Sequence, residues 1–420
     1  MAENNKLFGM KAENGRWIFV LLGFVINICL GSVYAYSVFK KPVQDWFSKT
    51  HSVSVTALEG NLPFMIFLAF FALFVFVGGR LMDKVGPRKL GLIGGVVVGL
   101  GWILAGLVPQ SIPSIWAVVL TYGVIGGAGV GLAYGGPLAV ATRWFPDKKG
   151  LAVGLTLAGF GGSPFISANV ASALIKTNGP MFTFLAMGLA FLVIVIVLAL
   201  FLKFPVAGWK PAGWQPKASA APAADLNTSA MVKTSAFWGL FLCYTIGCLA
   251  GLGAIGISSP VGQEVIKLDA AAAAVLVGVF AIFNGVGRPL FGWLTDRITP
   301  RWAACINLVI IIAASALMLM ASAGSTALYV VCFCLLWLCL GGWLAIAPTA
   351  TTTFFGVKNY ARNYGVVFLA YGIGAIIGGL ISGWSVDTFK GYNASFIITA
   401  VLAAIAIVIA FAMLKPVKKA

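Results

Sequence analysis

Long apolar segments, separated by short polar ones, constrain this chain more than any other feature of its sequence. They lie at about 17–39, 54–79, 90–108, 114–139, 151–175 and 181–203, and again at about 236–258, 270–295, 301–322, 327–350, 364–385 and 392–414. Each is close to the roughly 20 apolar residues that one helical membrane crossing needs. Because 60% of the 420 residues are hydrophobic and only 9% are charged, a soluble fold is excluded. We predict an all-α membrane protein with twelve transmembrane helices.

One long polar stretch divides these segments into two sets of six. It covers about 205–234 and is rich in Pro, Ala, Lys and Gly, which is the composition of a flexible linker. We therefore predict an N-terminal six-helix bundle over 1–204, a cytoplasmic linker over 205–234, and a C-terminal six-helix bundle over 235–420.

The positive charges predict the orientation. With both termini and the linker in the cytoplasm, Arg288 lies within the membrane and most other Lys and Arg residues lie inside. The exceptions that fall outside are Lys40, Lys41, Lys49, Lys176, Lys267 and Lys390. This bias follows the positive-inside rule. The N-terminal tail has no signal-peptide cleavage pattern and no transit-peptide features, so we expect a multi-pass protein of a bacterial inner membrane.

Several other classes of function are disfavoured. The net charge of +17 comes from short clusters between apolar runs, so we expect no nucleic-acid partner. All seven cysteines fall in apolar segments and the single histidine, His51, is in a predicted loop, so neither a disulfide framework nor a metal site is implied. The chain carries no catalytic motif and no channel filter motif. We expect no enzyme and no cofactor.

The two halves of the chain repeat each other. The loop GRLMDKVGPRK (79–89) is matched at the equivalent place by GWLTDRITPR (292–301), and 143–162 parallels 354–375. Such repeats joined by a linker are typical of an alternating-access carrier. In the matched loops we expect charged residues to tie helix ends together and to gate the cytoplasmic side. These residues are Asp83, Arg88, Asp296 and Arg297.

One basic residue, Arg288, lies well inside a predicted span. A charge near the bilayer centre costs a few kcal/mol or more, so it must face protein or water. Asn284 lies one helical turn earlier, and Gly285, Gly287 and Pro289 surround the charge. This pattern favours a guanidinium in a cavity, where it can bind a carboxylate through two parallel hydrogen bonds. The alternative is an arginine that snorkels toward the cytoplasmic interface.

The loop 79–89 resembles the signature loop of the major facilitator superfamily. Three further stretches together resemble the oxalate/formate antiporter family, which includes bacterial relatives of the monocarboxylate transporters. They are GVGLAYGGPLAVATRWFPDKKGLAVG (129–154), FNGVGRPLFGWLTDR (283–297) and FGVKNYARNYG (355–365). The resemblance implies the major facilitator fold, with two six-helix bundles around a central site. It also implies that Arg288 is the principal anion-binding residue.

The sequence departs from that family at positions which bear on the substrate. The oxalate exchanger of the family has a lysine seven residues after the RNYG motif, where this chain has Tyr371. It also has a tryptophan and a tyrosine on span 10, where this chain has Leu340 and Leu344. The aromatic positions of span 1, Tyr34 and Tyr36, are kept, as is Tyr134 of span 4.

Five residues form the candidate substrate-binding set: Arg288, Asn284, Tyr34, Tyr134 and Tyr371. The alternative for each tyrosine is packing with its hydroxyl on a backbone carbonyl, or a place in the interfacial aromatic belt. For Tyr36 the belt is the favoured interpretation. Trp337 and Trp343 stay unassigned. The remaining membrane asparagines, expected to form hydrogen bonds between helices, are Asn27, Asn169 and Asn307.

Charge then selects the substrate class. One guanidinium neutralises one carboxylate, whereas a dicarboxylate would leave a charge unpaired in a partly desolvated site. We therefore predict transport of small monocarboxylates of the lactate, pyruvate or formate type. No acidic residue lies deep in a span, and Asn284 stands where related animal carriers have an aspartate. Proton symport and anion exchange both stay open.

Two alternatives remain within the same superfamily. The first is an oxalate:formate antiporter. The second is a drug exporter, which would prefer apolar cations that Arg288 repels. The expected partners are a small organic anion, a proton or a counter-anion, and the lipid bilayer. We expect a monomer.

Overall fold

The computed structural model describes residues 6–206, 209–211, 225–356 and 359–415, and most of them are helical. The elements of the first half are β1 (Lys6–Leu7), β2 (Met10–Lys11), α1 (Ala12–Leu30), the 3-10 helix η2 (Gly31–Ala35), α2 (Tyr36–His51), α3 (Ala57–Val85), α4 (Pro87–Ser111), α5 (Ile115–Val118), the π-helix η3 (Val119–Gly126), α6 (Gly127–Trp144) and α7 (Lys149–Ala199). Those of the second half are α8 (Thr228–Met231), α9 (Ser235–Glu264), α10 (Ala270–Met318), α11 (Thr326–Phe355), α12 (Tyr360–Phe389) and α13 (Asn393–Met413). The two short strands pair antiparallel.

Ten helical segments of the described chain are long and apolar enough to cross a membrane. Two of them, Leu151–Ala199 and Ala270–Met318, have 49 residues each, which is more than twice the roughly 20 residues of one crossing. Each is interrupted by one residue with positive φ directly before a proline, Gly179 (φ 81°) and Thr299 (φ 80°). Proline suits the first turn of a new helix. Each segment therefore comprises two spans, which reconciles ten segments with twelve expected crossings.

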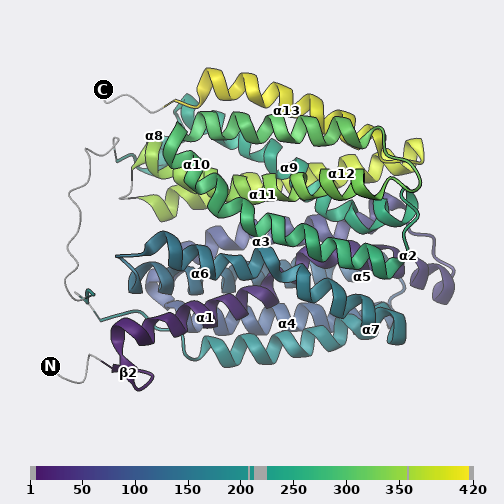
Figure 1. The fold of residues 1–420 in the computed structure, drawn as a ribbon. Coiled ribbons are helices and arrows are strands. Elements are labelled where there is room, and N and C mark those ends of the chain that lie inside the picture. Colours follow the sequence, from purple (N-terminus) through teal and green to yellow (C-terminus); the bar gives the residue numbers. More distant parts are fainter. Residues whose placement is uncertain (1–5, 207–208, 212–224, 357–358, 416–420) are drawn as a thin grey trace.

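The helices run side by side, and the two halves of the chain occupy opposite sides of the molecule, purple to blue against green to yellow (Figure 1). Where the halves meet, α3 packs along α12 and α7 packs along α10. Within the predicted linker, residues 207–208 and 212–224 lie outside the described residues. The division into two bundles at 204 and 235 remains a prediction.

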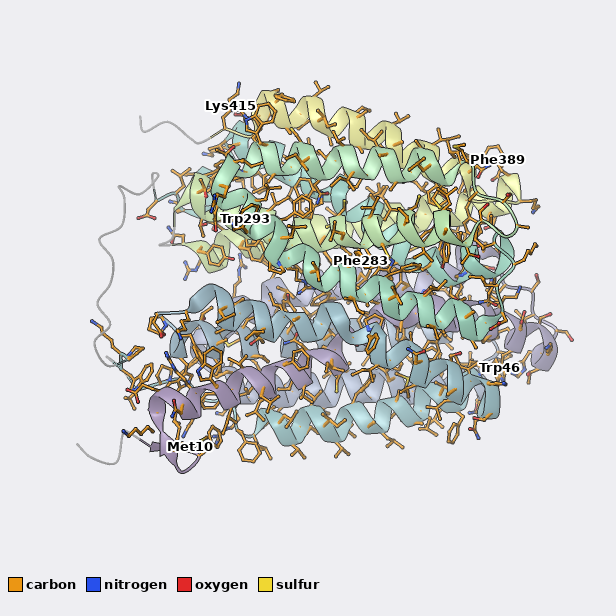
Figure 2. All side chains as sticks on the ribbon, in the orientation of Figure 1. Met10, Trp46, Phe283, Trp293, Phe389 and Lys415 are labelled. Atoms are coloured by element: carbon orange, nitrogen blue, oxygen red, sulfur yellow. The ribbon has the colours of Figure 1, made fainter. Side chains whose placement is uncertain are left out.

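The two ends of the helix array are distinct. Met10 and Lys415 lie at one end, which we call the proximal end (Figure 2). Trp46 and Phe389 lie at the opposite end, which we call the distal end. Under the predicted orientation the proximal end faces the cytoplasm and the distal end faces outward.

The surface along the helices is apolar. Large hydrophobic side chains such as Leu21, Val193 and Val408 are 61%, 59% and 69% exposed, and side chains of this kind project outward along the array (Figure 2). An exposed apolar surface of this extent is what a membrane-embedded protein presents to lipid. All seven cysteines are free and buried.

Glycines permit close packing of neighbouring helices. A Cβ at Gly287 of α10 would collide with the backbone carbonyl of Leu338 in α11, and one at Gly129 of α6 would collide with the backbone of Val98 in α4. Small residues at such positions let membrane helices approach each other closely. This close approach brings polar groups from distant parts of the sequence together at the centre.

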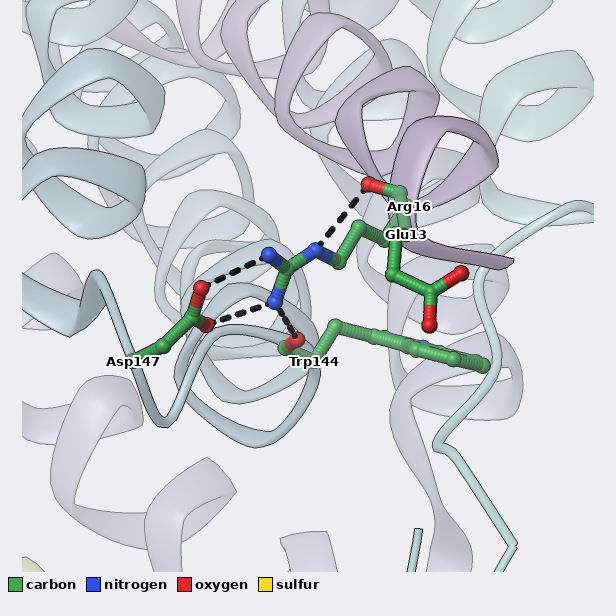
Figure 3. Close-up of polar contacts among 4 residues, drawn as sticks. All are labelled: Glu13, Arg16, Trp144 and Asp147. Carbon is green, nitrogen blue, oxygen red and sulfur yellow. Dashed lines mark hydrogen bonds and ion pairs between the residues drawn. The ribbon is translucent and has the colours of Figure 1, made fainter. Parts of the chain in front are cut away.

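An ion pair fixes the start of α1 at the proximal end (Figure 3). The Nη1 and Nη2 atoms of Arg16 donate to the two carboxylate oxygens of Asp147 at 2.6 and 2.7 Å. Nη1 also donates to the carbonyl of Trp144 at 3.0 Å, and the guanidinium lies 4.4 Å from the centre of the Phe145 ring. Because Arg16 hydrogen-bonds the ionised form of the Asp147 carboxyl, the pKa of that carboxyl lies below its usual value.

We predict that Asp147→Asn lowers the melting temperature of the purified protein by several degrees at pH 7. A depressed folded-state pKa contributes stability above the ordinary aspartate pKa of about 4, and this contribution is lost as pH falls through the folded-state value. The difference between wild type and variant should therefore shrink below about pH 4. Thermal unfolding in detergent across pH measures it.

The matched control for this measurement is Asp45→Asn, which removes an exposed carboxylate of α2. It should leave the melting temperature unchanged at every pH. If the melting temperature of wild type exceeds that of Asp147→Asn by the same amount below about pH 4 as at pH 7, the assigned ion pair is contradicted.

Candidate anion-binding site

The guanidinium of Arg288 lies where α10 of the second half meets α7 of the first half. The side chain is 7% exposed. Its Nη1 donates to the backbone carbonyl of Leu157 in α7 at 3.0 Å, and its Nη2 approaches Oδ1 of Asn284 at 3.4 Å. Its Nε has no partner in the described structure. The side chain thus points across the interface between the halves, so the snorkelling alternative is not what the structure adopts.

The partners of Arg288 are neutral. Within the described part of the chain, no carboxylate lies at ion-pair distance from this guanidinium. A buried cation without a counter-charge is costly in a membrane protein, and backbone and amide dipoles offset only part of that cost. The position is therefore electrostatically suited to an anion.

Asn284 connects Arg288 to the neighbouring helix. Its Oδ1 faces Arg288, while its Nδ2 donates to the carbonyl of Trp337 in α11 at 3.1 Å. The side chain is fully buried. It therefore bonds between helices and also lies beside the arginine, and its part in substrate binding remains a proposal.

A glycine that the sequence analysis did not single out makes room for this pair. A Cβ at Gly161 of α7 would lie 2.7 Å from Oδ1 of Asn284 and 3.3 Å from Nη2 of Arg288. No side chain fits at that position without displacing these polar atoms. Gly161 lies in the stretch 143–162, which parallels 354–375. A search of that repeat for small residues would have found it.

Two tyrosine hydroxyls join the halves near the same level. The hydroxyls of Tyr34 in η2 and Tyr371 in α12 are 2.6 Å apart, and both side chains are buried. Tyr34 lies in the 3-10 segment η2, which begins at Gly31, and a Cβ at Gly31 would collide with the backbone of Phe160. The 3-10 segment interrupts span 1, and such mid-span segments often mark functional positions.

Aromatic rings surround the two hydroxyls. The Phe160 ring centre lies 5.2 Å from that of Tyr34 and 5.4 Å from that of Tyr134. Phe71 packs edge-on against Tyr371 at 5.7 Å and against Tyr134 at 5.2 Å. Sequence analysis assigned neither Phe160 nor Phe71 to the site. Aromatic residues are common in membrane helices, so their type alone carried no signal.

The structure brings the five predicted residues into one region. Arg288 and Asn284 are in contact, Tyr34 and Tyr371 share a hydrogen bond, and Tyr134 joins them through Phe160. Trp337 lies between the two groups, since its carbonyl accepts from Asn284 and its ring centre is 6.3 Å from that of Tyr34. Hydroxyl donors and a guanidinium around an aromatic wall can bind a small carboxylate, and the substrate-binding roles of these residues remain proposals.

Two of the weaker expectations are corrected by the contacts. Tyr36 is only 1% exposed and donates to the carbonyl of Gly60 at 3.1 Å, so its assignment to the interfacial belt is wrong. Asn27 and Asn169 donate to carbonyls four residues earlier in their own helices. Among the described residues, neither forms a hydrogen bond to another helix. Asn307 does, since its Nδ2 donates to the carbonyl of Cys339 in α11 at 3.0 Å.

Three span-10 residues, Leu340, Trp343 and Trp337, contact α9 at different levels. Leu340 packs against Gly251 of α9, and Trp343 packs against Gly247 of the same helix. The indole nitrogen of Trp337 donates to Ser258 of α9 at 3.0 Å, and its ring centre lies 6.3 Å from that of Tyr34. Trp337 therefore borders the site, whereas Trp343 fills the interior of the second half.

The predicted gating residues lie at the proximal end. Asp296 and Arg297 are exposed and line the same hollow at the turn of α10, and Arg297 lies over the ring of Trp293 at 5.1 Å. Among the described side chains neither forms an ion pair. Arg88 is exposed, and the side chain of Asp83 lies outside the described residues. Their gating role therefore remains a prediction.

The fold is that of a multi-pass membrane protein. The family model of the Major Facilitator Superfamily matches residues 15–353 and 250–420. The crystal structure of a bacterial homologue of the human lysosomal transporter Spinster, inward-facing and occupied, superposes with a TM-score of 0.72. The superposition covers 96% of this chain and 97% of that chain at 16% identity, so this likeness concerns the fold alone.

The chain belongs to the major facilitator superfamily, and within it to the group that contains the oxalate:formate antiporter and the monocarboxylate transporters. It is 30% identical to the "Oxalate:formate antiporter" of Oxalobacter formigenes over 96% of this chain and 94% of that protein. It is 27% identical to "Monocarboxylate transporter 13" of Rattus norvegicus over 77% and 72% of the two chains.

Membership in this superfamily confirms several expectations. The protein is a multi-pass membrane protein and a secondary transporter of a small molecule, and it is not an enzyme. The orientation of the termini, the identity of the substrate and the roles of the site residues are not decided by membership.

We predict that Gly161→Ala reduces transport by about tenfold or more while the protein still folds. The added methyl group would displace Asn284 or Arg288, and a loss of about 1.4 kcal/mol in anion binding corresponds to tenfold weaker affinity. Substrate uptake into proteoliposomes by the purified variant measures this effect.

The matched control is Gly162→Ala, because a Cβ at Gly162 meets no atom within 4 Å. It should transport at nearly the wild-type rate. Near-normal uptake by Gly161→Ala, or an equal loss in Gly162→Ala, would remove Gly161 from the site.

Proposed function

We propose that the protein transports small monocarboxylates of the lactate, pyruvate or formate type across a bacterial inner membrane by alternating access. One observation carries the proposal. A buried guanidinium, that of Arg288, lies between the two halves, and its partners among the described residues are neutral. The hydroxyls of Tyr34 and Tyr371 lie in the same region. In the substrate complex, Arg288 binds the carboxylate and the tyrosines donate further hydrogen bonds to it.

The charge count supports a monoanion. One carboxylate neutralises Arg288, and the complex is then neutral. A dianion would leave one negative charge unpaired in a partly desolvated site, at a cost of several kcal/mol. The aromatic wall of Phe71, Phe160 and Phe368 suits the methyl group of lactate or pyruvate, since it offers apolar contact.

The charges at the site also support anion exchange over proton symport. Arg288 has no carboxylate neighbour in the described structure, and Asn284 cannot take up a proton in place of an aspartate. An empty carrier would have to close around an uncompensated charge, whereas the loaded carrier closes in a neutral state. Return of the empty carrier is therefore slow, and a bound anion accelerates the return.

Two alternatives stay within the same family. The relative at 30% identity is named as an oxalate:formate antiporter, which favours exchange and keeps oxalate as a candidate substrate. Against oxalate stand Tyr371, where that exchanger type has a lysine, and Leu340, which packs toward α9. A drug exporter is less well supported, because Arg288 repels apolar cations.

We predict that Tyr371→Lys raises competition by oxalate relative to lactate several-fold. If Tyr371 lines the same site as Arg288, a second cation there offers a partner to the second carboxylate of a dianion. It also repels Arg288 and so weakens binding of monoanions. Both effects change the ratio in the same direction. Inhibition of labelled lactate uptake by unlabelled oxalate or lactate, in proteoliposomes, measures the ratio.

The matched control is Tyr371→Phe, which removes the hydroxyl and leaves the charge unchanged. It should weaken lactate transport without raising the relative competition by oxalate. If a folded Tyr371→Lys variant shows a flat or falling ratio, Tyr371 does not contact the substrate.

A further inference from the structure

The N-terminus of α3, at the distal end, has its exposed backbone N–H groups satisfied in two different ways. A helix leaves its first four N–H groups without intrahelical partners. The side chain of Thr56 accepts from the N–H of Glu59 at 3.2 Å, and the side chain of Glu59 accepts from the N–H of Thr56 at 2.8 Å. This capping box lies entirely within the first half of the chain. It provides no acceptor for the N–H groups of Ala57 and Leu58.

These two N–H groups bond to the second half. Oδ1 of Asp387 accepts from Ala57 at 2.8 Å, and Oδ2 of the same carboxylate accepts from Leu58 at 2.9 Å. Asp387 lies in the last turn of α12, about 330 residues further along the chain. A carboxylate is favoured at this place because the N-terminus of a helix carries a partial positive charge. The cap of α3 is thus complete only while the two halves are in contact.

The contacts continue one turn further along both helices. Nδ2 of Asn61 in α3 donates to the carbonyl of Gly379 and to Oγ of Ser382 in α12, both at 3.0 Å. A Cβ at Gly383 would lie 2.5 Å from Cα of Leu58, so the two backbones are in close contact. Asn61 is 3% exposed. The seam between α3 and α12 is therefore closed at the distal end.

We propose that Asp387 and Asn61 form a latch that holds the distal face of the carrier shut. The proposal rests on the alternating-access cycle proposed above, in which α3 and α12 separate when the distal face opens. On separation, Ala57 and Leu58 exchange Asp387 for water and Asn61 loses both acceptors, whereas the Thr56–Glu59 capping box stays intact. Asp387 and Asn61 are thus positioning residues that favour the distally closed state without contacting substrate.

The size of the effect follows from helix capping. Loss of a capping side chain weakens a helix end by an amount equivalent to roughly tenfold in an equilibrium constant. Asp387→Asn retains one acceptor oxygen but places an NH₂ group against the second backbone N–H and removes the charge. The ratio of distally open to distally closed molecules should therefore rise up to about tenfold.

The test is a distance measurement across the distal face. Lys49 of the first half and Lys267 of the second half are exposed at that end, and Lys49→Cys with Lys267→Cys supplies two sites for spin labels. The native cysteines are buried. Pulsed electron resonance on the full chain in lipid nanodiscs, without substrate, gives the distance distribution. Asp387→Asn should increase its long-distance component, and Asp387→Glu should restore part of the closed population.

Two further variants make the result decisive. Glu59→Gln removes a carboxylate from the same helix end without touching the seam, so its distribution should match wild type. Asn61→Ala removes the second part of the latch and should also increase the long-distance component. It therefore tests the latch even if Asp387→Asn does not fold. An unchanged distribution in the Asp387 and Asn61 variants overturns the latch, as does an equal shift in Glu59→Gln.

The readout separates this inference from the substrate assignment. The distances are measured without any anion, so they do not depend on which anion is carried. A failed latch would leave anion binding at Arg288 intact, and a wrong substrate class would leave the distance shift intact.

Discussion

The buried guanidinium of Arg288 is the interaction on which the rest of the structure depends. A lone cation inside a membrane protein must be surrounded by dipoles or by an anion, because lipid offers neither. The protein supplies the carbonyl of Leu157 from one half and the amide of Asn284 from the other, and no described residue pairs with Nε. These dipoles hold the charge in place but do not neutralise it. We propose that this uncompensated charge, rather than a preformed shape, selects a carboxylate, and that a bound anion eases the passage between states.

Close helix packing makes this arrangement possible. Gly161 leaves room for the guanidinium beside α7, and Gly287 brings α10 against α11 one residue before the arginine. The 3-10 turn at Gly31–Ala35 places Tyr34 at hydrogen-bond distance from Tyr371 in the opposite half. At the distal end, the same two helices that carry Phe71 and Tyr371 are joined through Asp387 and Asn61. Contacts between the halves thus occur both at the site and at one face, which is the arrangement that an alternating mechanism needs.

Much of the fold was predictable from the sequence because apolar length and charge placement act locally. The spans, the turns before Pro180 and Pro300, and the lone arginine all follow from residues near one another in the chain. The partners of these residues were not predictable. Asn27 and Asn307 occupy similar apolar surroundings, yet one bonds to its own helix and the other to α11. Tyr36 was misassigned because a nearby carbonyl, that of Gly60, becomes available only after α2 and α3 pack. Gly161, Phe71 and the cap from Asp387 likewise depend on approaches between segments far apart in sequence.

The central claim is that the planar guanidinium of Arg288, and not merely a positive charge, binds the transported carboxylate. Counterflow of labelled lactate in proteoliposomes preloaded with unlabelled lactate, comparing wild type with Arg288→Lys, tests it most directly. An ammonium retains the charge but cannot present two parallel donors to one carboxylate. The account predicts lactate counterflow in wild type and a severe loss in Arg288→Lys at equal amounts of folded protein. Near-normal counterflow by Arg288→Lys would contradict it.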